Sequence, residues 1–464
     1  MKVSRRTLLA GAATLAAASG ASARVDAGEA PPRDAPSPAP GGARPRVHTL
    51  NGRSLEWRRV GGVKEFHLVA GEVEHEFAPG SRAKCWGYNG STPGPTIEAV
   101  EGERVRILVT NRLPEPTTVH WHGLLIPNGM DGVGGLNQPH ILPGETWAYE
   151  FTLRQHGTYM YHPHADEMTQ LAFGMMGFFI IHPREPVDPP VQRDYAFLLH
   201  NWALHPGTYR PDPAVMTEFD LWTFNSKVFP AIEPLLARQG ERVRIRVGNL
   251  SMHNHPIHLH GHRFVVTGSD GGRWPRALWR PEVTEIVGVG QVRELEFVAD
   301  NPGDWAVHYH MSHHTMNAMG HALANPVGVK QAGLEDRLRE YLPGVMRMGE
   351  AGMFDHNTHM GMGHVKGPEN TLPMATGQGP FGQIEMGGMF TLLKVRPDLR
   401  GADPRRGRRS SARAWPEGRP PSGRPDWVRT SFLSIRTLSG VSQGPGACLG
   451  EESGRCAAGL NRLR

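Results

Sequence analysis

The chain has 464 residues, among them 57 glycines, 40 prolines, 25 histidines and three cysteines. This length allows two or three domains with cores of their own, and the glycine and proline content favours short strands over long helices. Three cysteines are too few for a disulfide framework. The net charge is +5, but the two ends of the chain carry more positive charge than this total. The body between them is therefore acidic, and the overall charge does not imply nucleic-acid binding.

Residues 1–23 have the pattern of an export signal, with a basic start, a short apolar run and a small-residue end. Arg5-Arg6 followed by Thr7-Leu8-Leu9 resembles a twin-arginine signal, and an ordinary secretory signal is the alternative. We therefore expect a periplasmic or secreted protein. Because no later run reaches about 20 apolar residues, we expect no membrane anchor.

A repeated pattern organises the middle of the chain. Short alternating runs bounded by Pro, Gly and Asn are typical of antiparallel β-sandwiches. The segment "EGERVRILVTNRL" at 101–113 is echoed by "QGERVRIRVGNLS" at 239–251, and a histidine-rich strand follows each. The repeat predicts an all-β protein with two copies of one Greek-key sandwich, at 48–185 and 190–330.

Three further segments flank this body. Residues 24–47 are rich in Ala, Pro, Gly and Arg and predict a disordered leader. Residues 331–395 form a Met, Gly and His-rich extension that ends in a strand-like run. Residues 396–464 are rich in Arg, Pro, Ser and Gly, which predicts a basic, disordered tail.

Four H-x-H pairs carry the candidate chemistry. In a strand, residues i and i+2 point to the same face, so each pair places two imidazoles side by side. Together the pairs offer eight nitrogen ligands, and imidazole suits Cu, Zn, Fe and Ni alike. The pairs are His120 and His122, His162 and His164, His258 and His260, and His308 and His310.

Four motifs over residues 48–395 resemble those of multicopper oxidases. They are "YNGSTPGPTI" at 88–97, "DGVGGLNQPHILPG" at 131–144, "HNHPIHLHGH" at 253–262 and "HYHMSHHTMNAM" at 308–319. The resemblance implies cupredoxin-like domains that bind copper. It also implies an oxidase that takes single electrons from a phenol, Cu(I) or another metal ion and reduces O2 to water.

The resemblance assigns the eight histidines to a trinuclear cluster. It places His120 and His258 on the type 2 copper. The two type 3 coppers take His122, His162 and His310, and His164, His260 and His308. Asp131 matches an acid that orients water and supplies protons, and a turn aspartate before glycine is the alternative interpretation.

The type 1 copper site departs from the family pattern. His255, His314 and Met319 match its two histidines and its axial methionine, but the position of the thiolate ligand is Tyr309. Because 309 lies between 308 and 310, it faces away from the cluster. We therefore expect this site to be degenerate or absent. Three hypotheses remain: an impaired oxidase, a non-catalytic copper-binding or copper-tolerance protein, and a chain with an altered position 309.

Two further expectations follow from the resemblance. The spacing between His164 and His258 leaves no room for a third domain, and two-domain relatives form trimers that share each cluster between neighbouring subunits. Copper nitrite reductases carry the type 1 cysteine in domain 1, where this chain has Pro163, so that function is disfavoured.

The methionines of the extension have two interpretations. They could bind Cu(I) through soft thioethers, or cover an apolar surface. The residues in question are Met353, Met360, Met362, Met386 and Met389.

Overall fold

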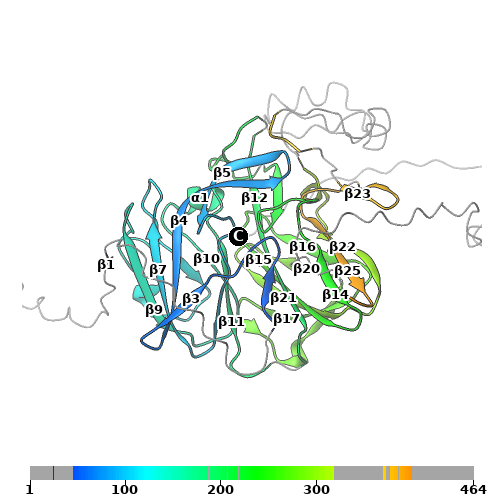
Figure 1. The fold of residues 1–464 in the computed structure, drawn as a ribbon, viewed down its shortest axis with the longest axis horizontal. Helices are drawn as coiled ribbons and strands as arrows, with labels where there is room; N and C mark the ends of the chain where they lie inside the picture. Colours follow the sequence, from blue (N-terminus) through cyan, green and yellow to red (C-terminus); the bar gives the residue numbers. More distant parts are fainter. Residues whose placement is uncertain are drawn as a thin grey trace, which may run out of the picture. The chain divides into compact units, whose positions relative to one another are not determined.

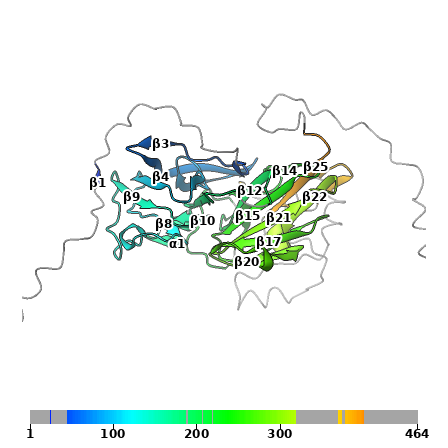
Figure 2. The ribbon, with the colours of Figure 1, turned by 90° about the horizontal axis from the view of Figure 1, so that it is seen from below.

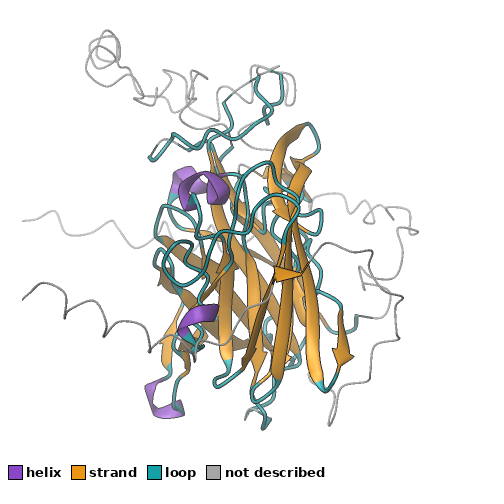
Figure 3. Cartoon of the chain, turned by 90° about the vertical axis from the view of Figure 1, so that its left-hand side faces the viewer, coloured by secondary structure: helices purple, strands orange, loops and turns teal. Residues whose placement is uncertain are grey.

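The computed structural model describes residues 24–25, 45–186, 189–205, 207–217, 219–317, 369–372, 377–384 and 386–399, all within one compact unit that ends at Asp403. Strands dominate these residues, and α1 (Glu167–Ala172) is their single α-helix (Figure 3). Three short 3-10 turns complete the elements: η1 (Asn128–Met130), η2 (Arg276–Leu278) and η3 (Ser312–Thr315). The all-β prediction is confirmed. The predicted signal and the basic tail from residue 400 lie outside the described residues.

The first sandwich is built from two sheets (Figure 1). One has the order β1-β9-β7-β4-β3, with β5 on β4, and the other has the order β6-β11-β10-β8. Their alternating side chains enclose a core that contains Phe66, Ile107, Trp121 and Tyr161. The strands are β1 (Arg24–Val25), β3 (Trp57–Val60), β4 (Val63–Ala78), β5 (Ser81–Tyr88), β6 (Ile97–Val100), β7 (Arg104–Asn111), β8 (His120–His122), β9 (Thr146–Thr152), β10 (Gly157–His162) and β11 (Gly177–His182).

The second sandwich repeats this plan (Figure 2). Its larger sheet has the order β13-β12-β15-β21-β17-β18, with β19 on β17 and β2 on β12, and its smaller sheet has the order β14-β25-β22-β16-β20. The strands are β2 (Val47–Thr49), β12 (Arg193–Trp202), β13 (Leu221–Phe224), β14 (Leu235–Arg238), β15 (Arg242–Asn249), β16 (His255–Leu259), β17 (Phe264–Ser269), β18 (Gly272–Arg273), β19 (Arg280–Glu282), β20 (Thr284–Val287), β21 (Val292–Val298), β22 (Gly303–Tyr309) and β25 (Phe390–Arg396). A separate hairpin joins β23 (Gly377–Gly379) to β24 (Gly382–Ile384).

The end of the second sandwich differs from the prediction. We expected this domain to end at residue 330, but β25 lies between β14 and β22 in its smaller sheet. The register pairs Val307 with Thr391 and His308 with Phe390, and Phe390 and Leu393 are buried. The Met-rich segment therefore lies, in chain order, between two paired strands of the sandwich. Local periodicity identifies such a strand but does not show which sheet it joins.

The two sandwiches contact each other through a shared apolar cluster. Met160 and Phe178 of the first pack with Leu198 and Val292 of the second. The strand β2 also belongs to this junction, because it pairs with β12 although it precedes the first sandwich in the chain. None of the described helices is long and apolar enough to span a bilayer.

Candidate metal centres

Four histidines converge at the end of β8 and β10, and we call them the first histidine group. The antiparallel register places His162 opposite His120. One ligand atom from each of His120, His122 and His162 lies within 4.8 Å of the others, and the ring of His164 lies 5.6 Å from that of His120. Trp121, between the two β8 histidines, packs into the core and anchors the strand.

The other four histidines form the second histidine group on β16, β22 and the residues that follow these strands. His258 lies opposite His308, and Nε2 of His260 is 3.0 Å from Nε2 of His308. The ring of His310 lies 5.4 Å from that of His258. His260 and His310 are exposed, whereas His162 of the first group is only 4% exposed.

Backbone carbonyls fix the orientation of four of these rings. A carbonyl can only accept a hydrogen bond, so the ring nitrogen facing it carries the proton and the other keeps its lone pair for a metal. Each carbonyl meets Nδ1, so Nε2 is the unprotonated nitrogen of each ring. The pairs are His120 with Asp131 (2.7 Å), His258 with Val283 (2.7 Å), His162 with Pro163 (3.0 Å) and His308 with Tyr309 (2.8 Å).

Burial keeps several of the histidines neutral. It lowers the pKa of His162 to about 3, and it also lowers the pKa values of His122 and His308. Neutral imidazole is the form that binds metal. These three rings are therefore in the ligand form near neutral pH.

Two carboxylates lie beside the first group. Asp131 Oδ1 is 3.6 Å from Nδ1 of His120, although the backbone carbonyl of Asp131 makes the shorter contact. Glu167 on α1 was not singled out from the sequence. Its carboxylate oxygens lie 3.4 Å from Nδ1 of His162 and 3.7 Å from Nε2 of His164. Its place three residues after His164 is the only sequence signal for it.

The two histidine groups are separate within one chain. In the part of the chain that the structure describes, no ring contact or hydrogen bond joins a member of the first group to a member of the second. Each group alone offers four imidazoles.

A fully buried cluster of side chains lies on the opposite face of β22. Nδ1 of His255 is 3.0 Å from Nδ1 of His314, and Nε2 of His255 is 2.6 Å from the Ser251 hydroxyl. Trp222 stacks on His314 at 5.0 Å, and the ring of Tyr309 lies 4.9 Å from that of His255. Met319, Met353, Met360 and Met362 lie outside the described residues.

Tyr309 belongs to the apolar core of the second sandwich. Its ring lies 5.2 Å from that of Phe224, and it shares a buried cluster with Met389, which is itself fully buried. Among the described residues its buried hydroxyl has no hydrogen-bond partner. Burial raises the pKa of this phenol well above its ordinary value, so it stays protonated.

Two protein-family models match this chain. Models described as multicopper oxidase match residues 70–186 and 206–329. The chain belongs to the multicopper oxidase family. A crystal structure of a blue copper oxidase from Nitrosomonas europaea, another member, is similar with a TM-score of 0.53 and 25% identity, over 71% of this chain and 85% of that one. The two sandwiches are therefore cupredoxin-like.

Two curated multicopper oxidase relatives match shorter stretches. The chain is 39% identical over 139 residues to a copper resistance protein A homolog of Pseudomonas syringae pv. tomato, which is 30% of this chain and 23% of that protein. It is 30% identical over 272 residues to laccase-20 of Oryza sativa subsp. japonica, which is 52% of this chain and 45% of that one. The chain thus matches less than half the length of either relative.

The copper that this family binds suits the donor atoms of the two histidine groups better than those around Tyr309. In the groups, the four carbonyl-held rings have an unprotonated Nε2, which is the form in which imidazole binds copper. Around Tyr309, the described residues offer two imidazoles and a protonated phenol but no thiolate. The histidine groups therefore have donor chemistry that fits copper, whereas the residues around Tyr309 lack the soft sulfur ligand of a blue site.

Proposed function

We propose that this chain is an exported multicopper oxidase with an intact trinuclear cluster and no functional type 1 copper. It would couple one-electron oxidation of a phenol, Cu(I) or another metal ion to the reduction of O2 to water, with slow turnover. The observation that carries the proposal is the pair of histidine groups, in which backbone carbonyls hold four rings by Nδ1 and so leave Nε2 as the unprotonated nitrogen. The bound copper cluster would supply the site of oxygen reduction.

The residues have distinct parts in this proposal. His120 and His258 hold the type 2 copper, and the hydrogen bonds of their Nδ1 atoms to Asp131 and Val283 fix both rings. The carboxylate of Asp131, about one-third exposed, lies where it can orient water and pass protons next to His120. The type 3 ligands are His122, His162 and His310 for one copper and His164, His260 and His308 for the other.

Tyr309 explains the expected loss of turnover. A cysteine at this position would bind the type 1 copper between two histidines that bind the cluster, which provides a short covalent path for electrons. The buried phenol remains protonated and is a poor ligand. Electrons must then reach the cluster by a slower route.

We further propose that the cluster forms between copies of the chain in a homotrimer. The two histidine groups do not meet within one chain, and His260 and His310 of the second group are exposed. Exposed apolar side chains lie on or beside the elements that carry the groups, as expected of surfaces that another protein covers. They include Leu125 and Met168 near the first group and Val283 and Ile286 near the second.

A subunit-mixing experiment tests the shared cluster. The variants His162→Ala/His164→Ala and His308→Ala/His310→Ala should each lose type 3 copper when expressed alone. In a ring of randomly mixed chains, about one quarter of the interfaces would combine two intact groups. Co-expression should therefore restore that fraction of type 3 absorbance and oxygen uptake. No restoration, together with a monomeric wild-type chain that binds the full copper set, would contradict the proposal.

A copper-binding protein without oxidase activity is the alternative. Tyr309 favours it, because a buried phenol replaces the thiolate through which electrons would enter the cluster. Copper content and oxygen uptake measured on the same sample separate the two functions. A full trinuclear copper set with no oxygen uptake from phenols, Cu(I) or Fe(II) would support the alternative.

Export is proposed from the N-terminal sequence alone. Replacing Arg5 and Arg6 by lysine should retain the protein in the cytoplasm if the twin-arginine pathway carries it. Cell fractionation with an antibody to the mature protein measures this. Unchanged periplasmic or secreted protein would favour an ordinary secretory signal.

A further inference from the structure

The strand β10 lies between the two sandwiches of one chain. Tyr159 and Tyr161 face the core of the first sandwich. The alternate residues Thr158 and Met160 contact the second sandwich, and His162 lies at the end of this same face. At Gly248 of β15 an added Cβ would lie 2.8 Å from the sulfur of Met160, so the strands approach closely.

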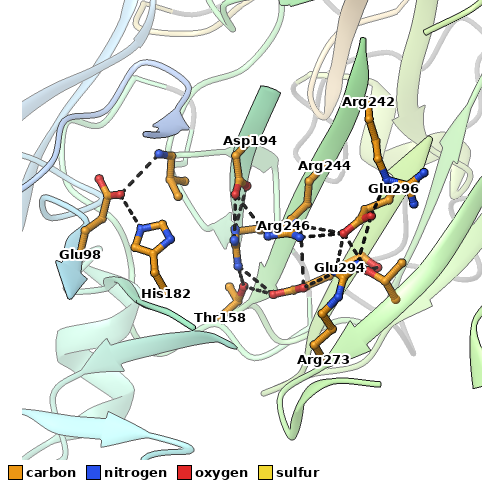
Figure 4. A network of polar contacts seen from close by, with 12 residues as sticks. Glu98, Thr158, His182, Asp194, Arg242, Arg244, Arg246, Arg273, Glu294 and Glu296 are labelled. Atoms are coloured by element: carbon orange, nitrogen blue, oxygen red, sulfur yellow. Dashed lines mark hydrogen bonds and ion pairs between the residues drawn. The ribbon is translucent and has the colours of Figure 1, made fainter. Parts of the chain in front are cut away.

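Thr158 joins a buried network of charges in the second sandwich (Figure 4). Arg246 binds both carboxylate oxygens of Asp194, at 2.7 and 2.8 Å. Its Nη1 donates to Glu294 at 2.8 Å and to the hydroxyl of Thr158 at 2.6 Å. That hydroxyl in turn donates to Glu294 at 2.7 Å. A single hydroxyl from the first sandwich is thus bonded to both an arginine and a glutamate of the second.

The buried network makes this contact rigid. Arg246, Asp194 and Glu294 are each less than 5% exposed, so their charges depend on one another and on directed hydrogen bonds. Without the Thr158 hydroxyl, one arginine N–H and one glutamate oxygen lose a partner where water does not replace it. Because losing these hydrogen bonds costs free energy, they hold β10 in one position on the second sandwich.

A second contact reaches the first histidine group directly. His122 lies against Gly290 in the turn between β20 and β21, where an added Cβ would lie 3.6 Å from Cε1 of the His122 ring. The backbone N–H of Gly290 donates to Asn249 at 2.9 Å, and its φ of +73° suits glycine. Nδ1 of His122 meanwhile lies 3.3 Å from Nε2 of His162, toward the group. The second sandwich therefore also packs against this ring.

We propose that the second sandwich of each chain positions the first histidine group of the same chain, with Thr158 as the principal positioning residue. This inference rests on the proposed function, in which another copy supplies the second group. A closed ring requires a definite angle between the two sandwiches of every subunit. His162 lies four residues from Thr158 along the same strand, so a small rotation at Thr158 displaces the group from its partner.

Three variants test the positioning role. Thr158→Val keeps the shape of the side chain and removes the hydroxyl, whereas Thr158→Ser keeps the hydroxyl. The matched control is Thr267→Val, because Thr267 is buried and contacts Glu294 and Glu296 of the same network but lies wholly within the second sandwich. Light scattering after size exclusion gives the trimer fraction. Copper titration followed by type 3 absorbance gives copper affinity, and thermal denaturation gives stability.

We expect Thr158→Val to bind cluster copper about tenfold more weakly and to lose trimer, the scale seen when contacts behind metal ligands are removed. Thr158→Ser should behave as wild type. Thr267→Val should keep the wild-type trimer fraction and copper affinity, even if its melting temperature falls as much as that of Thr158→Val. Wild-type copper affinity and assembly in Thr158→Val, or equal losses in Thr267→Val, would overturn the positioning role alone. A wild-type monomer with a full copper set would overturn the proposed assembly itself.

Discussion

The two faces of β22 differ in how well their residues suit copper. On one face His308 lies opposite His258, the carbonyl of Tyr309 holds its Nδ1, and its unprotonated Nε2 faces His260. On the other face Tyr309 points into an apolar core and its hydroxyl has no partner among the described residues. Strand alternation separates the two environments completely. A large change on one face can therefore leave the ligand geometry of the other intact.

The largest expected effect, on copper content and oxygen uptake, comes from removing the histidines on the His308 face of β22. His308→Ala/His310→Ala deletes two of the four imidazoles of the second group, so type 3 copper and oxygen uptake should fall to background. Metal analysis by mass spectrometry and absorbance near the type 3 band measure this. His253→Ala, a nearby histidine outside both groups, is the control. Unchanged copper content in the double variant would contradict the assignment of this face.

Placing a thiolate on the Tyr309 face of β22 should give the next largest effect. Tyr309→Cys supplies a thiolate between His255 and His314, so the copper-loaded variant should turn blue and gain oxidase activity of about tenfold or more, which corresponds to about 1.4 kcal/mol of barrier. Visible absorption and oxygen uptake against the parent measure it. Tyr309→Ser is the matched control, since it relieves the bulk without adding sulfur. A parent that is already blue and as fast as the variant would refute our interpretation of position 309.

A buried histidine that lies on neither face of β22, His200, should make the stability of the protein sensitive to acid. Burial lowers the pKa of His200 to about 4, whereas an unfolded histidine titrates near its ordinary value of 6.5. Between these values the unfolded chain binds the proton and the folded chain does not. Stability is therefore lost as the pH falls from 6.5 to 4, by about 3 kcal/mol for this residue.

Urea denaturation of the copper-free protein over this pH range measures the effect. His200→Gln should be less sensitive to acid than wild type. Identical acid sensitivity in His200→Gln and wild type would show that this ring does not carry the effect.

The smallest effect concerns the cost of the orphaned hydroxyl. Tyr309→Phe removes a buried polar group without a partner and keeps the ring, so it should raise the free energy of unfolding by about 1–2 kcal/mol. Chemical denaturation measures the change. Tyr161→Phe provides the contrast, because the hydroxyl of Tyr161 donates to the carbonyl of Pro95 and its removal should destabilise the protein. A destabilised Tyr309→Phe would mean that the hydroxyl has a partner after all.

Local patterns in the sequence determined the fold class and the histidine groups. The spacing of each H-x-H pair predicted two neighbouring imidazoles on one strand face, and the structure pairs His120 with His162 and His258 with His308 across neighbouring strands. Only β8 contains both members of its pair, because β10, β16 and β22 each end before the second histidine. The same alternation separated position 309 from its neighbours. These inferences succeeded because the period of a strand is a property of a few consecutive residues.

Only the tertiary structure decided which distant segments meet. It placed β25 beside β22, although residues 310–389 separate them in the chain. It also showed the Tyr309 hydroxyl without a partner among the described residues, and Thr158 bonded to Arg246 and Glu294 of the other sandwich. Such contacts depend on how sheets pack and on which buried polar atoms find partners. No local repeat in the sequence encodes either, because both are settled by residues far apart in the chain.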